Sequence, residues 1–308
     1  MRAPAHERER PPEVAASHRA SFSLVSPFAR PELICSTERV AARLGDPRVR
    51  IVDCRFAFDR DMRAEYLRGH IPGAVHLDWS TDIAAPPPPS GHPRWMLAAA
   101  DDLARRMSAL GISNDTTVVG YDSEGGHHAA RLWLGLRRYG HTAAAVMAGG
   151  IQQWLREGRP LEPGEVSVAA GRFTARPVEG VIATKEEVLE AVRRGDPWLL
   201  DVRRPTEHTG EEVRSARGGH IPGAVNILWK DALNDDWTMK DPGAIEEMYA
   251  DAGFGAETRT ITYCQAGVRA AFTHLLLTAL GHEDVRTYDG SWEEWGNDPD
   301  VPVVQGRS

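Results

Sequence analysis

The chain has 308 residues, of which 42% are hydrophobic and 26% are charged, and its formal net charge is −8. This composition is ordinary for a globular protein and allows one large domain or two smaller ones. An acidic chain without a basic stripe interleaved with aromatic residues is a poor partner for nucleic acid. The sequence has no run of about 18 apolar residues that would span a membrane. We therefore expect neither nucleic acid nor a membrane as a partner.

The N-terminal segment and the number of cysteines indicate in which cellular compartment the protein works. The first 30 residues mix arginines with glutamates and contain no apolar segment of the kind found in secretory signals. We interpret residues 1–22 as a disordered extension. Cys35, Cys54 and Cys264 are an odd number of cysteines at wide spacing. This pattern disfavours a disulfide framework and favours the reducing cytoplasm.

An internal repeat organises the chain. GHIPGAV occurs at 69–75 and again, letter for letter, at 219–225. Further along, YGHTAAAVMAGGIQQW at 139–154 matches LGHEDVRTYDGSWEEW at 280–295. Colinear matches of this kind predict two copies of one domain. The predicted divisions are a first domain at 23–157, a linker at 158–180 and a second domain at 181–305.

Each copy alternates strands with helices. In chain order, the first copy contains VRIVD (49–53), AVHLD (74–78), TTVVGY (116–121), RLWLGLRRY (131–139) and AAVMA (144–148). In the second copy, Thr184 and Glu187 form a capping box before a helix that Gly195 ends. It continues with strands at 198–202, 224–228, 258–263 and 284–288, helices at 244–252 and 268–280, and a helical turn at 291–295. This order predicts an α/β protein of two tandem domains, each a mostly parallel sheet flanked by helices.

The repeat also separates scaffold from chemistry, because features present in both copies are more typical of the scaffold. The shared features are His70 with His220, the strand-end pairs Asp53–Arg55 and Asp201–Arg203, and Trp154 with Trp295. We expect the charged pairs to be buried ion pairs or caps, and the tryptophans to lie in the core. The repeat aligns Cys54 with Val202, and a cysteine that takes the place of valine is typical of a small buried apolar residue.

The position of Cys264 is occupied by different residue types in the two copies. At the offset of 141 residues it stands opposite Ser123, which follows Asp122. A loop between a parallel strand and a helix lies at the carboxyl edge of the sheet, where α/β proteins bind ligands. Backbone amides and the helix end there stabilise a thiolate and an anionic substrate. Arg269 opposes the helix dipole from the first turn, which suggests a substrate contact; a solvated surface arginine is the alternative.

The repeat, the doubled GHIPGAV and the single cysteine loop together resemble the two-domain rhodaneses, the thiosulfate and 3-mercaptopyruvate sulfurtransferases. The similarity covers residues 23–305. It implies a non-catalytic first domain and a second domain that carries a persulfide on the catalytic Cys264. The substrate loop would be Gln265, Ala266, Gly267, Val268 and Arg269. The resemblance implies no cofactor and no metal, a small-molecule sulfur donor, and a thiol or cyanide acceptor, with a protein thiol as a further candidate.

The donor is less clearly marked than the nucleophile. A loop that resembles those of thiosulfate-preferring members would have a basic residue soon after the cysteine. This chain has Gln265 and Ala266 there. A chain that resembles mercaptopyruvate-preferring members would have a Cys-Gly-Ser-Gly loop and two arginines upstream of it. Here Glu207 stands where the first arginine is expected, Arg214 is a counterpart of the second, and Arg204 is a substitute. We predict thiosulfate as the better donor and mercaptopyruvate as a weaker one.

Two other functions stay open at this point. A loop that resembles those of rhodanese-related phosphatases would read Cys-x5-Arg. The loop from Cys264 to Arg269 reads Cys-x4-Arg and is one residue shorter. The shorter loop favours a sulfur atom over a phosphoryl group. A module that only binds sulfur or relays it to a protein partner would use the same cysteine without turnover of a small acceptor.

Overall fold

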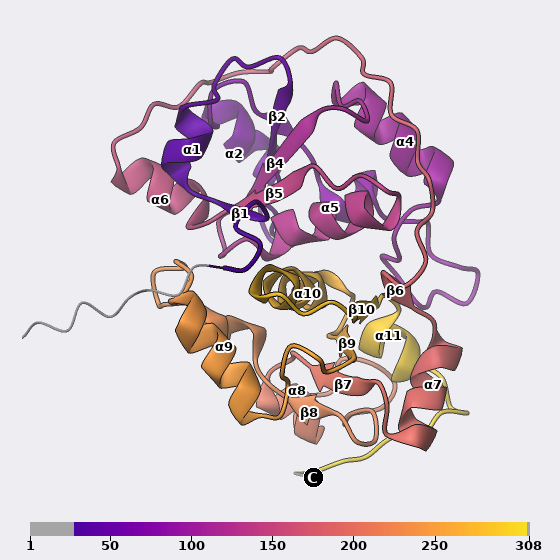
Figure 1. Cartoon of the computed structure of the whole chain (residues 1–308). Helices are drawn as coiled ribbons and strands as arrows, with labels where there is room; N and C mark the ends of the chain where they lie inside the picture. Colours follow the sequence, from indigo (N-terminus) through magenta and orange to yellow (C-terminus); the bar gives the residue numbers. More distant parts are fainter. Residues whose placement is uncertain (1–27, 307–308) are drawn as a thin grey trace, which may run out of the picture.

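The computed structural model describes residues 28–306, and the extension expected at 1–22 lies outside them. Two α/β units are stacked on each other, as Figure 1 shows. Each contains a five-stranded sheet, and the strand orders β1-β5-β4-β2-β3 and β6-β10-β9-β7-β8 are the same for the two copies. Every strand pair recorded in the two sheets is parallel. The predicted fold class is confirmed.

Within residues 28–157, the first unit holds the N-terminal sheet and six helices. Its strands are β1 Ile34–Cys35, β2 Val49–Asp53, β3 Val75–His76, β4 Thr117–Tyr121 and β5 Ala144–Met147. Its helices are α1 Thr37–Ala41, α2 Met62–Arg68, α3 Trp79–Asp82, α4 Ala100–Ala109, α5 His127–Arg138 and α6 Gly150–Arg156.

The second unit repeats the arrangement. Its strands are β6 Ile182–Ala183, β7 Trp198–Asp201, β8 Val225–Asn226, β9 Thr260–Tyr263 and β10 Val285–Tyr288. Its helices are α7 Lys185–Arg194, α8 Pro205–Thr209, the 3-10 turn η1 Trp229–Ala232, α9 Pro242–Asp251, α10 Val268–Leu280 and α11 Ser291–Trp295. The predicted capping box is present at the start of α7, and Gly195 ends this helix with φ +69°.

The features shared by the two copies are structural, as the repeat indicates. Arg55 and Arg203 each donate to the aspartate two residues earlier at 2.6 Å, and these pairs are buried. The indoles of Trp154 and Trp295 have no exposed surface. His70 and His220 are likewise fully buried, and Nδ1 of each lies 2.9 Å from a backbone carbonyl oxygen. Breaking either arginine–aspartate pair would leave an unpaired buried charge, which is costly. The two ion pairs therefore hold the chain in place at the ends of β2 and β7.

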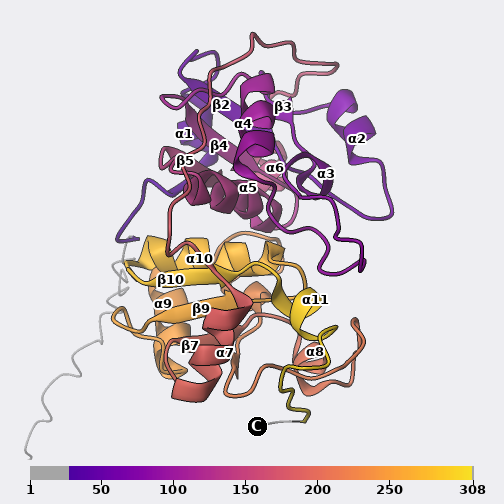
Figure 2. The ribbon, with the colours of Figure 1, turned by 90° about the vertical axis from the view of Figure 1, so that its right-hand side faces the viewer.

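The two units meet through their longest helices. Helices α5 and α10 lie between the two sheets in both Figure 1 and Figure 2. Trp133 of α5 packs edge-on against the ring of His274 of α10, with 5.3 Å between centroids. Arg131 and Asp289 form a buried ion pair across the same boundary. One hydrophobic cluster therefore includes residues of both units, and the loops that precede α5 and α10 are brought together.

Between α6 and β6, residues 157–181 form neither helix nor strand. This segment runs over the outside of the first unit before it enters the second (Figure 1). Within residues 28–306, no helix combines the length and the apolar character needed to cross a membrane.

Candidate active site

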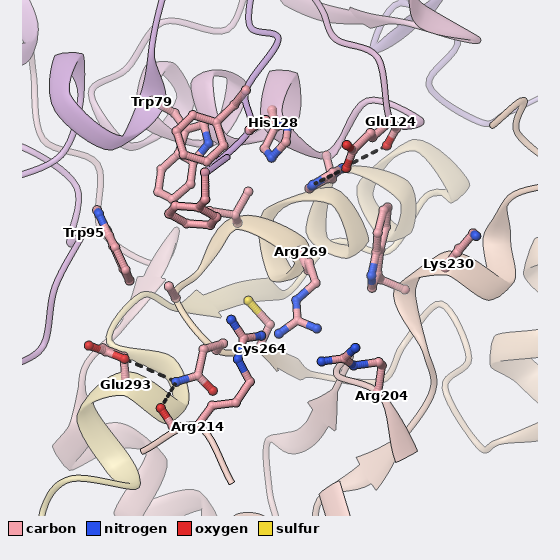
Figure 3. Close-up of a pocket in the computed structure, with 18 of the residues that line it drawn as sticks. Trp79, Trp95, Glu124, His128, Arg204, Arg214, Lys230, Cys264, Arg269 and Glu293 are labelled. Carbon is pink, nitrogen blue, oxygen red and sulfur yellow. Dashed lines mark hydrogen bonds and ion pairs between the residues drawn. The ribbon is translucent and has the colours of Figure 1, made fainter. Parts of the chain in front are cut away.

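A cavity of about 740 Å³ lies between the two units, and Cys264 is one of its lining residues. Cys264 directly follows β9, at the carboxyl edge of the second sheet. In Figure 3 its sulfur lies beside the guanidinium of Arg269, with Trp79 and Trp95 of the first unit across the cavity. Only 1% of Cys264 is exposed, so a donor must enter the cavity to reach the thiol.

The loop that carries Cys264 is held in shape by one glycine and one hydroxyl group. Gly267 has φ +73°, and a Cβ there would lie 2.8 Å from polar atoms of Arg131 and Asp289. The Ser291 hydroxyl accepts hydrogen bonds from the amides of Cys264 and Gly267, both at 3.2 Å. It donates to the carbonyl of Tyr288 at 2.8 Å. The loop is thereby closed around the start of α10, where the first amides have no carbonyl partner within the helix.

Three arginines beside the thiol share one carboxylate. Glu207 accepts two hydrogen bonds from Arg269, at 2.8 and 3.1 Å. It also accepts from Arg214 at 3.2 Å and from the side chain of Arg204 at 3.3 Å. Arg204 also pairs with Glu212, so three arginines face two carboxylates, and the cluster gives the cavity near Cys264 a net positive charge.

The pKa values in this cluster follow from these contacts. Burial by itself raises the pKa of Glu207, but the hydrogen bonds and charge of Arg269, with Arg214, lower it to about 2. Burial opposes the charge of Arg269, whereas its hydrogen bonds to Glu207 and the nearby Cys264 sulfur raise its pKa. Only 16% of the Arg269 side chain is exposed, so the solvated-surface alternative is wrong for this arginine.

The cavity brings the predicted site residues together. Cys264, Gln265, Ala266, Val268, Arg269, Arg204 and Arg214 all line it. Gly267 does not line the cavity and acts on the site through its backbone conformation.

The residue of the first copy that corresponds to Cys264 is Asp122. Tyr121 and Tyr263 each donate to the buried aspartate of the neighbouring strand, at 2.6 and 2.9 Å. The next residues are Asp122 and Cys264, whose carbonyls each accept an amide hydrogen bond at 2.9 Å, from residues 151 and 292. The alignment of Cys264 with Ser123 is therefore wrong, because the first loop has one extra residue.

The first copy shows what such a loop holds. The carboxylate of Asp122 accepts hydrogen bonds from the amides of Glu124 and Gly126, both at 2.8 Å, and of His128 and Ala129, at 2.8 and 3.1 Å. An anion thus occupies the amide-lined turn. In the second copy, a thiol takes the place of this anion.

Comparison with known proteins agrees with this geometry. The family model for the rhodanese-like domain matches residues 36–157 and 184–298. The chain belongs to the rhodanese-like family of sulfurtransferases. It is 36% identical over 294 residues to the sulfur carrier protein TtuD of Thermus thermophilus, covering 91% of this chain and 99% of the relative. It is 34% identical to a thiosulfate sulfurtransferase of Pseudomonas aeruginosa over 280 residues, covering 91% and 99%.

A solved structure supports the same rhodanese architecture. The 3-mercaptopyruvate sulfotransferase SseA from Escherichia coli superposes with a TM-score of 0.75 at 30% identity, covering 85% of this chain and 99% of that one. Two rhodanese-like domains in tandem are therefore common to this chain and to a crystal structure.

Several residues of this rhodanese site are not evident from the sequence. Ser291 has a detectable signal, since the repeat places it opposite Gly150, so the hydroxyl occurs in one copy alone. Glu293 of α11 accepts from Gln265 at 3.2 Å and from Arg94 of the first unit at 2.6 Å. The first-unit residues of the cavity have no signal in the repeat, because only the packing of the units brings them to Cys264.

Within residues 28–306, one group of side chains has the geometry of metal ligands. Ligand atoms of Asp122, His127 and His128 lie within 4.8 Å of one another. However, each carboxylate oxygen of Asp122 already accepts two amide hydrogen bonds. The carboxylate is committed to the backbone, and we assign no metal to this group.

Proposed function

We propose that this rhodanese transfers a sulfur atom from a small donor to a thiol or cyanide acceptor through a persulfide on Cys264. The supporting observation is the comparison of the two loops. The first loop binds the carboxylate of Asp122 with four backbone amides, and Cys264 replaces that aspartate in the second loop. A turn suited to an anion also stabilises a thiolate and the charged outer sulfur of a persulfide.

The reaction has two halves. The Cys264 thiolate attacks the outer sulfur of the donor, the sulfur–sulfur bond of thiosulfate breaks, and sulfite leaves with the electron pair. The acceptor then attacks the outer sulfur of the persulfide, and Cys264 leaves as a thiolate. The positive cavity near Cys264 stabilises the anions in both halves.

The arginine cluster favours thiosulfate as the donor. Glu207 accepts hydrogen bonds from both terminal nitrogens of Arg269, so a keto acid carboxylate would have to compete with Glu207 for the end-on bidentate grip of this arginine. A thiosulfate dianion requires positive potential more than one fixed geometry. Mercaptopyruvate would depend on Arg204 and Arg214, whose side chains are about half exposed.

The mass of the intact protein tests this proposal. After treatment with thiosulfate, wild type should gain the mass of one sulfur atom, and cyanide should remove it. Cys264→Ser should gain nothing and should lose turnover while it unfolds at nearly the same temperature. Cys54→Ser is the matched control, because Cys54 is also buried and directly follows a strand, β2. This variant should still take up one sulfur atom. A loaded Cys264→Ser protein would contradict the assignment.

A relay of sulfur to a protein partner is the second candidate, and the name of the Thermus thermophilus relative, a sulfur carrier, favours it. The persulfide would be the same, but a protein thiol would be the acceptor. Rapid multiple turnover with thiosulfate and cyanide supports an enzyme of small molecules, whereas loading without turnover supports the relay. Either route suits the reducing cytoplasm, where a thiolate persists.

A further inference from the structure

The cavity around Cys264 has a second wall that the persulfide chemistry does not use. This first-unit wall is formed by Phe56, Phe58, Trp79, Trp95, Glu124, His127 and His128. Figure 3 shows Trp79, Trp95, His128 and Glu124 on the side of the cavity opposite the arginines. Thiosulfate and cyanide are too small and too polar to need four aromatic rings.

His127 stands in this wall with one nitrogen fixed and the other turned to a carboxylate. Its Nδ1 lies 2.8 Å from the backbone carbonyl oxygen of Glu124, so Nδ1 carries the proton and Nε2 has a free lone pair. Nε2 lies 3.9 Å from Oε2 of Glu124, which stabilises the ring once it is protonated. The ring also packs on Trp229 of the second unit, with 4.5 Å between centroids.

His128 is less suited to accept a proton. Its ring packs against Phe56 at 5.3 Å between centroids, and its buried Nδ1 has no hydrogen-bond partner among residues 28–306. Burial, and then the neighbouring His127, lower the pKa of His128 well below its usual value, so this imidazole is neutral near pH 7. We therefore treat His128 as part of the apolar wall.

We propose that the first-unit wall binds an organic thiol as the sulfur acceptor, and that His127, supported by Glu124, takes the proton of that thiol. The proposal rests on the persulfide at Cys264. The aromatic rings would contact the apolar body of the acceptor, and Phe58, with 74% of its surface exposed, is available for this contact. The first unit then takes part in the second half-reaction, although the sequence predicts a non-catalytic domain.

The step is balanced without an added oxidant or reductant. The acceptor sulfur forms a bond to the outer sulfur of the persulfide as its S–H proton moves to Nε2 of His127. The bond between the outer sulfur and Cys264 breaks, and its electron pair stays on Cys264 as a thiolate. The products are the persulfide anion of the acceptor and protonated His127, which releases its proton to the open cavity.

Acceptors that differ in their need for a base test the proposal. Loaded enzyme is mixed with mercaptoethanol, which must lose a proton, or with thiophenol or sulfite, which are already ionised at mildly alkaline pH. In His127→Gln, unloading by mercaptoethanol should slow about 100-fold, the lower end of the usual contribution of a general base. Unloading by thiophenol and by sulfite, and loading from thiosulfate, should be unchanged.

Other variants separate chemistry from folding. Glu124→Gln should slow mercaptoethanol less than His127→Gln does, and Phe58→Ala should raise the KM for thiophenol without a change in loading. Ser123→Ala, in the same loop but outside the cavity, is the control. In His127→Gln, unloading by mercaptoethanol should follow the thiolate fraction of mercaptoethanol itself as the pH rises, because no protein base takes its proton. The other charged groups near Glu124, the partner of this histidine, are Asp122, Arg60 and Asp59, and Lys230 lines the same cavity.

Two outcomes would overturn the inference. One is a His127→Gln enzyme that unloads to mercaptoethanol as fast as wild type. The other is an equal loss for all three acceptors, which would indicate a structural role for the histidine. A wild type that does not load at all would instead contradict the proposed persulfide, so the failures of the two proposals are distinguishable.

Discussion

Arg269 and Glu207 form a bidentate ion pair beside the candidate nucleophile, with nitrogen–oxygen distances of 2.8 and 3.1 Å. A cation in the first turn of a helix is unfavourable by itself, because it opposes the helix dipole. Glu207, from α8, supplies the counterion that makes this position acceptable. The pair thus links α8 to the first turn of α10.

The first prediction concerns Arg269. Arg269→Ala should raise the KM for thiosulfate by an amount equivalent to about 1–3 kcal/mol, the usual range for a charge-assisted hydrogen bond. Arg204→Ala is the control, and its effect should be smaller because about half of the Arg204 side chain is exposed. Steady-state kinetics with thiosulfate and mercaptopyruvate check the prediction. An unchanged KM for both donors would mean that Arg269 only pairs with Glu207.

The second prediction concerns Glu207 and pH. Its pKa is about 2 in the folded protein against 4.5 for an ordinary glutamate. The carboxylate therefore stabilises the fold fully above pH 4.5, and this stabilisation is lost as the pH falls toward 2. Glu207→Gln should lower the unfolding free energy by up to about 3 kcal/mol at pH 7, and the gap to wild type should close between pH 4.5 and 2.

Urea denaturation at several pH values measures this gap. Glu211→Gln is the matched control, since Glu211 is exposed and lies four residues further along. Its unfolding free energy should follow that of wild type. A Glu207→Gln gap that stays constant with pH would show that packing, rather than charge, is lost.

The third prediction concerns Ser291, which holds the amides of Cys264 and Gly267. Ser291→Ala removes both hydrogen bonds, and kcat should fall about tenfold, equivalent to about 1.4 kcal/mol. Ser291 has φ +50°, so Ser291→Gly relieves backbone strain and reproduces the residue of the first copy, Gly150. Ser291→Gly should regain stability but not kcat. Recovery of kcat in the glycine variant would show that only the backbone conformation matters.

The fourth prediction concerns His274, which lies in α10 at the boundary between the units. Burial, with a smaller effect of Arg137, lowers its pKa to about 3 from 6.5. At this residue the unfolded chain binds one more proton than the folded chain between these values. His274 by itself should therefore contribute a fall in stability of about 1.4 kcal/mol per pH unit as the pH drops from 6.5 to 3.

His274→Phe should lose this part of the pH dependence while it keeps the packing on Trp133. Thermal unfolding between pH 7 and 4 compares the slopes of the two proteins. Glu283→Gln is the control, because Glu283 is exposed and lies just beyond the C-terminal end of α10. Equal slopes for wild type and His274→Phe would contradict the assignment of the acid sensitivity to this ring.

The sequence alone predicted the fold class and placed Cys264, the candidate nucleophile, in a loop between a strand and a helix, because both depend on local order along the chain. The repeat of GHIPGAV and the alternation of strands with helices are contiguous patterns. The edge strands β1 and β6 were missed, since each has two residues and no periodicity to detect. A single-residue difference between the loops was also missed, which led to Ser123 in place of Asp122.

What the sequence by itself determined is the position of Cys264 at a strand end, because strand, turn and helix follow one another directly. Only the tertiary structure decided what surrounds it. Glu207 neutralises Arg269 from 62 residues away, and His127 reaches the cavity through the packing of α5 on α10. Such contacts depend on how two folded units meet, and no spacing along the chain encodes the distance between side chains that far apart in sequence.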